Sequence, residues 1–229
     1  MSTERVLGVD ACRAGWIGIA LDGDRVDAYQ TRTIADLVTT AWAEGELAVV
    51  AVDIPIGLPD NSRRQADVEA RRAVGRLASS VFFTPVRGTL DYPDHGSASA
   101  HNREHVGEGM SIQAFGLLPK VREVDVWLPS APCDVVEVHP EVSFAALAGA
   151  PLDARKHTWA GARLRHRLLT EAGITIGDIG APGARANVDD VLDAAVAAWT
   201  ARRVNEGTAT SLPETPQTFA DGVHSAIWR

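Results

Sequence analysis

Short apolar runs and alternating apolar positions divide the first part of the chain into strands. Residues 6–9 and 47–52 are runs of Val, Leu, Ala and Gly, the composition of buried strands. Residues 15–21 and 25–29 are also strand-like, and an Asp-Gly-Asp sequence joins them, which is typical of a hairpin turn. The first three strands therefore predict an antiparallel meander.

Apolar positions three and four residues apart predict helices after this meander. Thr33 is a suitable N-cap for the first helix, which leads to the strand at 47–52. Such a crossover normally places the returning strand parallel to a neighbour. A fifth strand and further helices are predicted, the strand at 135–139 and the helices at about 63–77, 111–128, 141–148, 158–172 and 188–204.

These elements predict one α/β domain over residues 1–229, because no linker or internal repeat divides the chain. Residues 79–110 are rich in Gly, Pro, Ser and His, and we expect an irregular insertion there after the fourth strand. A long loop of this kind is either a functional lid or disordered.

Composition places the chain among ordinary globular proteins, with 45% hydrophobic and 23% charged residues. Two cysteines, no secretory signal and no membrane-spanning run predict a cytoplasmic protein with reduced thiols. The net charge of −8 argues against non-specific coating of nucleic acid, although a local basic groove stays open. Only Lys120 and Lys156 are lysines among the basic residues, so the many arginines indicate a coding bias first.

Two aspartates stand where buried strands end. Asp10 follows residues 6–9, and Asp53 follows residues 47–52. A carboxylate at such a place is costly unless hydrogen bonds or a cation compensate it. Adjacent parallel strands would hold the two about 5 Å apart. This pattern predicts a divalent-metal site, and the alternative is that each aspartate only begins a turn.

Further carboxylates are candidates for the same site. Asp190 and Asp193 are three apart on the predicted helix at 188–204, while Asp189 and Asp193 are four apart, so both pairings share a face. Asp189 stands in the first turn, where an acidic residue also serves to cap the helix and offset its dipole. Asp193 lies inside the apolar part of the helix, where that explanation is weaker. Glu137 alternates with valines and either faces solvent or contributes to a metal site.

Several motifs together resemble a known family. The late-helix pattern Asp-x-x-Asp-Ala at 190–194 is similar to that of RuvC-type resolvases, which have the ribonuclease H-like fold. More broadly, the chain resembles a prokaryotic family described as domain of unknown function 429 and predicted to contain RNase H-like nucleases. The motifs that carry this resemblance are Gly8-Val9-Asp10 with Gly15-Trp16, Val52-Asp53-Ile54-Pro55-Ile56-Gly57-Leu58, Ser79-Ser80-Val81-Phe82, Glu137-Val138-His139-Pro140-Glu141 and Asp189-Asp190-Val191-Leu192-Asp193-Ala194.

The resemblance implies a ribonuclease H-like α/β fold, with a five-stranded mixed sheet in the order 3-2-1-4-5 and helices on both faces. It also implies a nuclease that hydrolyses phosphodiesters of DNA or RNA with Mg²⁺ or Mn²⁺. The catalytic and metal-ligating roles pass to Asp10, Asp53, Asp190 and Asp193, with Glu137 as a further candidate ligand. RuvC-type enzymes carry Glu where this chain has Asp53, which leaves the number of ions open.

Basic residues near these motifs are candidates for binding the phosphates of a nucleic-acid partner. We take Arg63, Lys120 and Lys156 as the candidates, and Arg63 and Lys156 belong to two Arg-rich stretches. A solvated helix face explains such stretches equally well.

Two other functions stay open. A protein with this fold and no turnover, acting in binding or regulation, would fit the acidic charge and the missing base-recognition motif. His101, Glu104 and His105 match the H-x-x-E-H pattern of some zinc peptidases, but the surrounding glycines leave room for only a short helix. The oligomeric state is open as well, a homodimer included.

Overall fold

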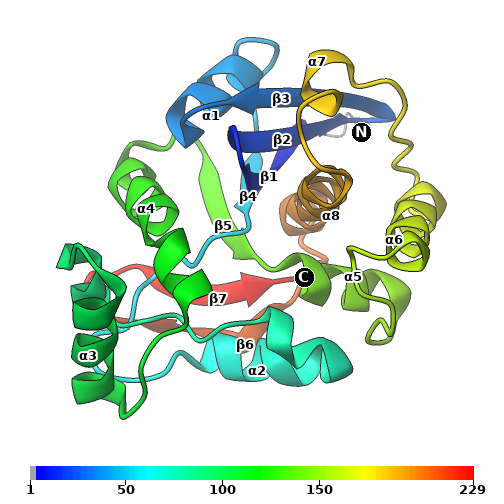
Figure 1. Ribbon diagram of the computed structural model, residues 1–229. Coiled ribbons are helices and arrows are strands. Elements are labelled where there is room, and N and C mark those ends of the chain that lie inside the picture. Colours follow the sequence, from blue (N-terminus) through cyan, green and yellow to red (C-terminus); the bar gives the residue numbers. More distant parts are fainter. Residues whose placement is uncertain (1–3) are drawn as a thin grey trace.

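One seven-stranded mixed sheet runs through the molecule (Figure 1). The computed structural model describes residues 4–229. The strand order is β3-β2-β1-β4-β5-β7-β6, in which β1, β4, β5 and β7 are parallel and the outer pairs are antiparallel. The strands are β1 (Val6–Cys12), β2 (Gly15–Asp22), β3 (Arg25–Thr31), β4 (Val49–Val52), β5 (Asp134–Val138), β6 (Ser211–Thr218) and β7 (His224–Trp228).

Helices cover both faces of this sheet (Figure 1). One face packs against α1 and α4, and the other packs against α8, α5, α6 and α2. No helix within residues 4–229 combines the length and apolarity needed to cross a membrane. The α-helices are α1 (Ile34–Trp42), α2 (Gln65–Ala73), α3 (His95–Val106), α4 (Ile112–Trp127), α5 (Pro140–Ala148), α6 (Trp159–Glu171), α7 (Gly180–Gly183) and α8 (Val188–Asn205), and 3₁₀ segments are η1 (Gly75–Ser80), η2 (Arg87–Asp91) and η3 (Leu128–Ser130).

The mixed α/β architecture is confirmed, and the first five strands lie in the order 3-2-1-4-5. The prediction of five strands was wrong, because the hairpin of β6 and β7 continues the sheet beyond β5. Pro213 and Pro216 interrupt the alternation in β6 and hide it from pattern analysis. Proline cannot donate to a ladder and is tolerated at an edge, which is where β6 lies.

The predicted irregular insertion at 79–110 contains a well-formed helix, so that expectation was wrong over much of its length. Asp94 caps α3 by accepting from Ser97 N at 3.0 Å, and Gly107 ends it in the left-handed conformation. Asn102 fixes the helix from within, since it accepts from Val86 N. The buried residues of α3 are small or polar, namely Ala98, Ser99 and Asn102. The helix therefore has no apolar stripe that would predict it from the sequence.

The register of β1 and β4 decides which side chains share a face. Leu7 pairs with Val50 and packs toward α1 and α4, while Gly8 pairs with Ala51 on the face of α8. Because side chains alternate along a strand, Asp10 follows Gly8 onto the α8 face. Gly8 also permits close contact with α8, because a Cβ at this position would overlap the α8 backbone, 2.7 Å from Ala197 C.

Replacing Gly8 by Ala should therefore push α8 away from the sheet. We expect Gly8→Ala to lower the free energy of unfolding by roughly 3 kcal/mol, at the upper end of overpacking effects, in urea denaturation. Gly116→Ala is the matched control, because a Cβ at Gly116 meets nothing within 4 Å and alanine favours the helix. Equal stability of the two variants would contradict the close contact of α8 with β1.

Candidate functional site

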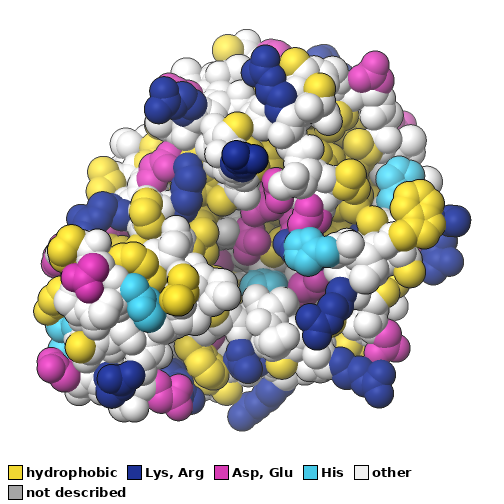
Figure 2. Space-filling model, in the orientation of Figure 1, with side chains coloured by type: hydrophobic (Ala, Val, Ile, Leu, Met, Phe, Trp, Pro, Cys, Tyr) yellow, Lys and Arg dark blue, Asp and Glu magenta, His cyan; other side chains and the backbone are white. Residues whose placement is uncertain are grey.

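Three of the predicted aspartates converge on one cavity. Asp10 at the end of β1, Asp53 directly after β4, and Asp193 on α8 all line a cavity of about 420 Å³. The parallel register continues past β4, since Asp53 N donates to Val9 O at 3.0 Å, and this places the two strand ends side by side. Figure 2 shows acidic side chains gathered in a central hollow.

Asp10 and Asp193 are buried, Asp53 is half-buried, and their charges act on one another. Asp10 is 7% and Asp193 is 1% exposed. Burial, followed by the charges of Asp53 and Asp193, raises the pKa of Asp10 well above its usual value. Burial also raises the pKa of Asp53 to about 7 and that of Asp193 to about 6. The charged form of the cluster therefore depends on a compensating cation.

Lys156 supplies part of that compensation. Its Nζ donates to Asp193 Oδ2 at 2.5 Å, and its charge lowers the pKa of both Asp53 and Asp193 against the effect of burial. Burial disfavours the ammonium of Lys156, but the carboxylates outweigh that effect and raise its pKa. Lys156, one of the candidates for phosphate binding, lines the cavity, where it is bonded to the carboxylate of Asp193.

The donor set suits a hard divalent cation. All three groups are carboxylates, and Asp193 Oδ1 is buried with no hydrogen-bond partner. The ligand oxygens of the three aspartates do not all lie within 4.8 Å of one another, since the described residues contain only one such group of potential ligands, in α3. A divalent ion held by these residues would supply counter-charge that Lys156 supplies in this structure.

The other aspartates of α8 lie outside the lining of the cavity. Asp190 is partly buried and accepts from Asn187 Nδ2 at 3.0 Å, although its charge still raises the pKa of Asp10. Asp189 lies 3.0 Å from His157 Nδ1. The structure thus brings Asp193 into the cluster and leaves Asp190 near it with a hydrogen-bond partner of its own.

Glu137 has a different environment from the predicted metal ligand. It pairs with Val52 in the register, so it lies on the face opposite Asp53, although it also lines the carboxylate cavity. Arg64, which is fully buried, donates to Glu137 Oε1 at 2.5 Å and to Oε2 at 2.9 Å. Ile56 N also donates to Oε2, at 2.7 Å. These bonds hold the loop after β4, and both oxygens of Glu137 are already engaged.

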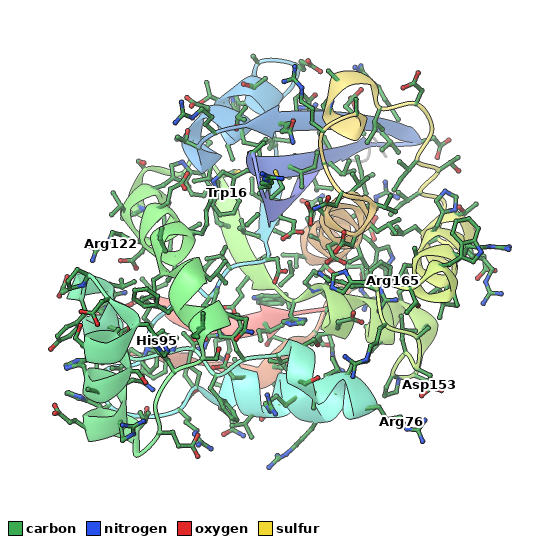
Figure 3. The ribbon with its side chains drawn as sticks, in the orientation of Figure 1. Trp16, Arg76, His95, Arg122, Asp153 and Arg165 are labelled. Carbon is green, nitrogen blue, oxygen red and sulfur yellow. The ribbon has the colours of Figure 1, made fainter. Side chains whose placement is uncertain are left out.

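A second buried pair was missed by sequence reasoning. Arg165 is completely buried and donates through Nη2 to both oxygens of Glu141, at 2.7 and 2.6 Å. Figure 3 shows Arg165 on the inner side of α6. Its position among other arginines suggested a basic surface, whereas its spacing from Gly161 and Leu169 on the buried face of α6 was the available signal. Glu141 lines the cavity and contributes negative charge near Asp53.

His139 is a further cavity residue that the sequence did not single out. Its Nε2 lies 3.3 Å from Ser80 O, and its Nδ1 is buried with no partner. Burial lowers the pKa of His139, so the ring is neutral at neutral pH. A neutral imidazole with an unpartnered nitrogen is suited to accept or transfer a proton in the cavity.

Arg63 and Lys120, the other predicted phosphate-binding residues, lie outside this cavity. Arg63 forms an ion pair with Glu108, and its guanidinium carbon lies 4.4 Å from the centroid of the Phe83 ring. Lys120 bonds Glu123 at 3.0 Å and lies over the ring of Trp16. Neither residue lines the carboxylate cavity.

A match to a family model supports the resemblance seen in the motifs. The model described as "Protein of unknown function (DUF429)" matches residues 8–218. The chain belongs to this DUF429 family. Comparisons with curated proteins and with solved structures found no significant match.

The DUF429 protein also brings together the three residues of the zinc-peptidase pattern. His101, Glu104 and His105 offer ligand atoms within 4.8 Å of one another on α3. A peptidase would reserve the glutamate for water activation and need a further ligand, and no other described residue joins this group. Glu104 and His105 are exposed, away from the carboxylate cavity.

Removing the ammonium of Lys156 should change the titration of the cluster. In Lys156→Met we expect Asp193 to titrate above its present pKa of about 6 and Asp53 above about 7, because an attractive charge is lost. Carboxyl-carbon NMR shifts against pH measure both groups. Lys120→Met, which removes the other lysine, should leave them unchanged, and a fall in either pKa in Lys156→Met would contradict the ion pair.

Stability of the DUF429 protein should decrease as pH rises through the titration of the cluster. The folded protein binds more protons than the unfolded chain between about pH 4 and 7, because burial raises these carboxyl pKa values. We expect Asp10→Asn to raise Tm at pH 8 by about 2–4 °C, equivalent to roughly 1 kcal/mol, and less at pH 5. Calorimetry measures Tm, and Asp91→Asn at an exposed position is the control. A lower Tm for Asp10→Asn at pH 8 would contradict the repulsion of Asp10 by Asp53 and Asp193.

Proposed function

We propose that this DUF429 protein is a divalent-metal-dependent nuclease with a ribonuclease H-like arrangement of its site. The observation that carries the proposal is the convergence of Asp10, Asp53 and Asp193 from β1, β4 and α8 on one cavity. An antiparallel meander followed by parallel β4 and β5 also fits the arrangement that the family resemblance implies.

The proposed cofactor is Mg²⁺ or Mn²⁺, held by Asp10, Asp53 and Asp193, with Asp190 near enough to adjust the charge. When bound, such an ion activates water and stabilises charge on the phosphate oxygens. The unpartnered Asp193 Oδ1 supports this assignment, because a buried carboxylate oxygen without a donor is costly unless a cation binds it.

Other residues of the cavity would act on the substrate directly. Lys156, once separated from Asp193, can donate to a phosphate oxygen, and Arg155 and His157 line the same cavity. The neutral ring of His139 can accept a proton within it. These basic groups stand beside the three carboxylates in the lining of the cavity. They would orient a phosphodiester and balance its negative charge.

A second candidate is a binding or regulatory protein that keeps this site without turnover. The ion pair of Lys156 with Asp193 favours it, because an internal ammonium compensates the cluster without an added ion. Metal-dependent cleavage distinguishes the two candidates.

The proposed nuclease is tested with single-stranded, duplex, hybrid and branched DNA and RNA in Mg²⁺ or Mn²⁺. We expect cleavage that EDTA abolishes, and a decrease of about 100-fold or more in Asp10→Asn and Asp193→Asn, since each removes a ligand charge. Gel analysis of end-labelled substrates measures the rates.

Asp91→Asn is the matched control, because the Asp91 side chain is 82% exposed on η2 and should not affect cleavage. Equal activity in both site variants would identify a contaminating nuclease and overturn the proposal. Nucleic-acid binding without cleavage under every metal condition would establish the second candidate instead.

A further inference from the structure

An exposed tryptophan marks the beginning of α6. Trp159 is 78% exposed, more than any other large hydrophobic side chain in the described chain. The guanidinium carbon of Arg163, one turn later, lies 5.9 Å from the centroid of its ring. Figure 2 shows a large hydrophobic side chain beside basic and histidine side chains where α6 lies in Figure 1. An aromatic ring this exposed contributes little to the core.

The surroundings of Trp159 are positive in an acidic protein. Residues 154–170 contain no Asp or Glu, although the whole chain carries a net charge of −8. Arg165 in this stretch is neutralised inside the fold, whereas Arg163 and Arg167 are exposed. Arg167 also forms an ion pair with Glu171, the last residue of α6, at 3.6 Å, and because both side chains are exposed to water this pair is weak. The exposed face of α6 therefore complements an anion.

This face borders a groove between α6 and α8. The groove, of about 690 Å³, is lined by Trp159, Arg163 and Arg167 along α6 and by Val188 and Leu192 of α8. Immediately before Trp159 in the chain, residues 155–157 line the carboxylate cavity. The linings of the groove and the cavity are therefore neighbours in sequence, separated only by Thr158 before α6 and adjacent at Leu192 and Asp193 on α8.

We propose that the α6 groove binds single-stranded nucleic acid, with one base stacked on Trp159 and phosphates at Arg163 and Arg167. The inference rests on the proposed nuclease function and names its substrate class. A strand bound along α6 would approach the three aspartates by way of residues 155–157, which line the cavity and immediately precede Thr158 and Trp159. Arginines four apart on the helix are about 6 Å apart along its axis and can contact neighbouring phosphates.

Stacking is the reason for preferring single strands. A base in a duplex is already stacked on its neighbours, whereas an unpaired base has a free face for an indole ring. The exposed face of α6 presents one aromatic ring with two arginines, and such a combination binds single strands without reading their sequence.

The test is fluorescence anisotropy with an end-labelled, mixed-sequence single strand, as RNA and as DNA, in EDTA to prevent cleavage. We expect Trp159→Ala to weaken binding about tenfold and Trp159→Phe to retain most of it, because a phenyl ring still stacks. Arg163→Ala with Arg167→Ala should weaken binding and reduce the salt slope by about 1.4. A matching duplex should bind more weakly and be insensitive to Trp159→Ala.

Arg76→Ala is the control for loss of one positive charge, because Arg76 is 86% exposed, pairs only with exposed Asp153 and lies outside the groove. Figure 3 shows both residues at the molecular surface. Single-strand binding unchanged by Trp159→Ala and by the double arginine variant would overturn the inference, while metal-dependent cleavage would still support the nuclease.

Sedimentation gives a further opposing outcome. If Trp159→Ala dissociates a dimer and leaves oligonucleotide binding unchanged, the groove joins two copies of the chain and the inference fails. If Trp159→Ala weakens binding but no metal condition gives cleavage, the groove assignment holds and the nuclease proposal fails.

Discussion

The close packing of α8 on β1 is the constraint on which the site depends. Gly8 has no side chain, so the backbone of α8 can approach the strand at Ala194 and Ala197. Asp193 precedes this contact on the helix, and Asp10 follows Gly8 by two residues on the same face of the sheet. The helix and the strand therefore bring two carboxylates together, and β4 adds the third through its parallel register. Ordinary core packing thereby positions charged groups that would otherwise repel one another.

The balance of charge around the cavity separates carboxylates that are held by arginines from an aspartate with an unpartnered oxygen. Glu137 and Glu141 each bond a fully buried arginine, which satisfies both of their oxygens. Asp193 has one oxygen bonded to Lys156 and the other without a partner. Bidentate arginine pairs are strong and geometrically fixed, whereas a lysine ammonium is a mobile point charge. The cavity is thus lined by two glutamates fixed by arginines and by the Lys156–Asp193 pair, in which the cation is held less rigidly.

The sequence predicted much of this arrangement because the strong signals are local. Buried parallel strands read as apolar runs, so the positions of Asp10 and Asp53 at strand ends could be seen without coordinates. The depth of Asp193 in an apolar helix also had a visible signal. Pairing between distant residues had no such signal: Glu137 lines the cavity, but Arg64, just before α2, bonds both of its oxygens. Prolines concealed β6, and the small polar contacts of α3 resembled a loop.

Arg165 has an additional effect on motion near the site. Besides bonding Glu141, its Nη1 donates to Ala154 O at 2.9 Å, two residues before Lys156. The main chain leading to Lys156 is thus fastened to a buried guanidinium, and α6 begins soon after it. Since this stretch of backbone is anchored, movement of the ammonium away from Asp193 would require rotation of the Lys156 side chain and not displacement of the main chain.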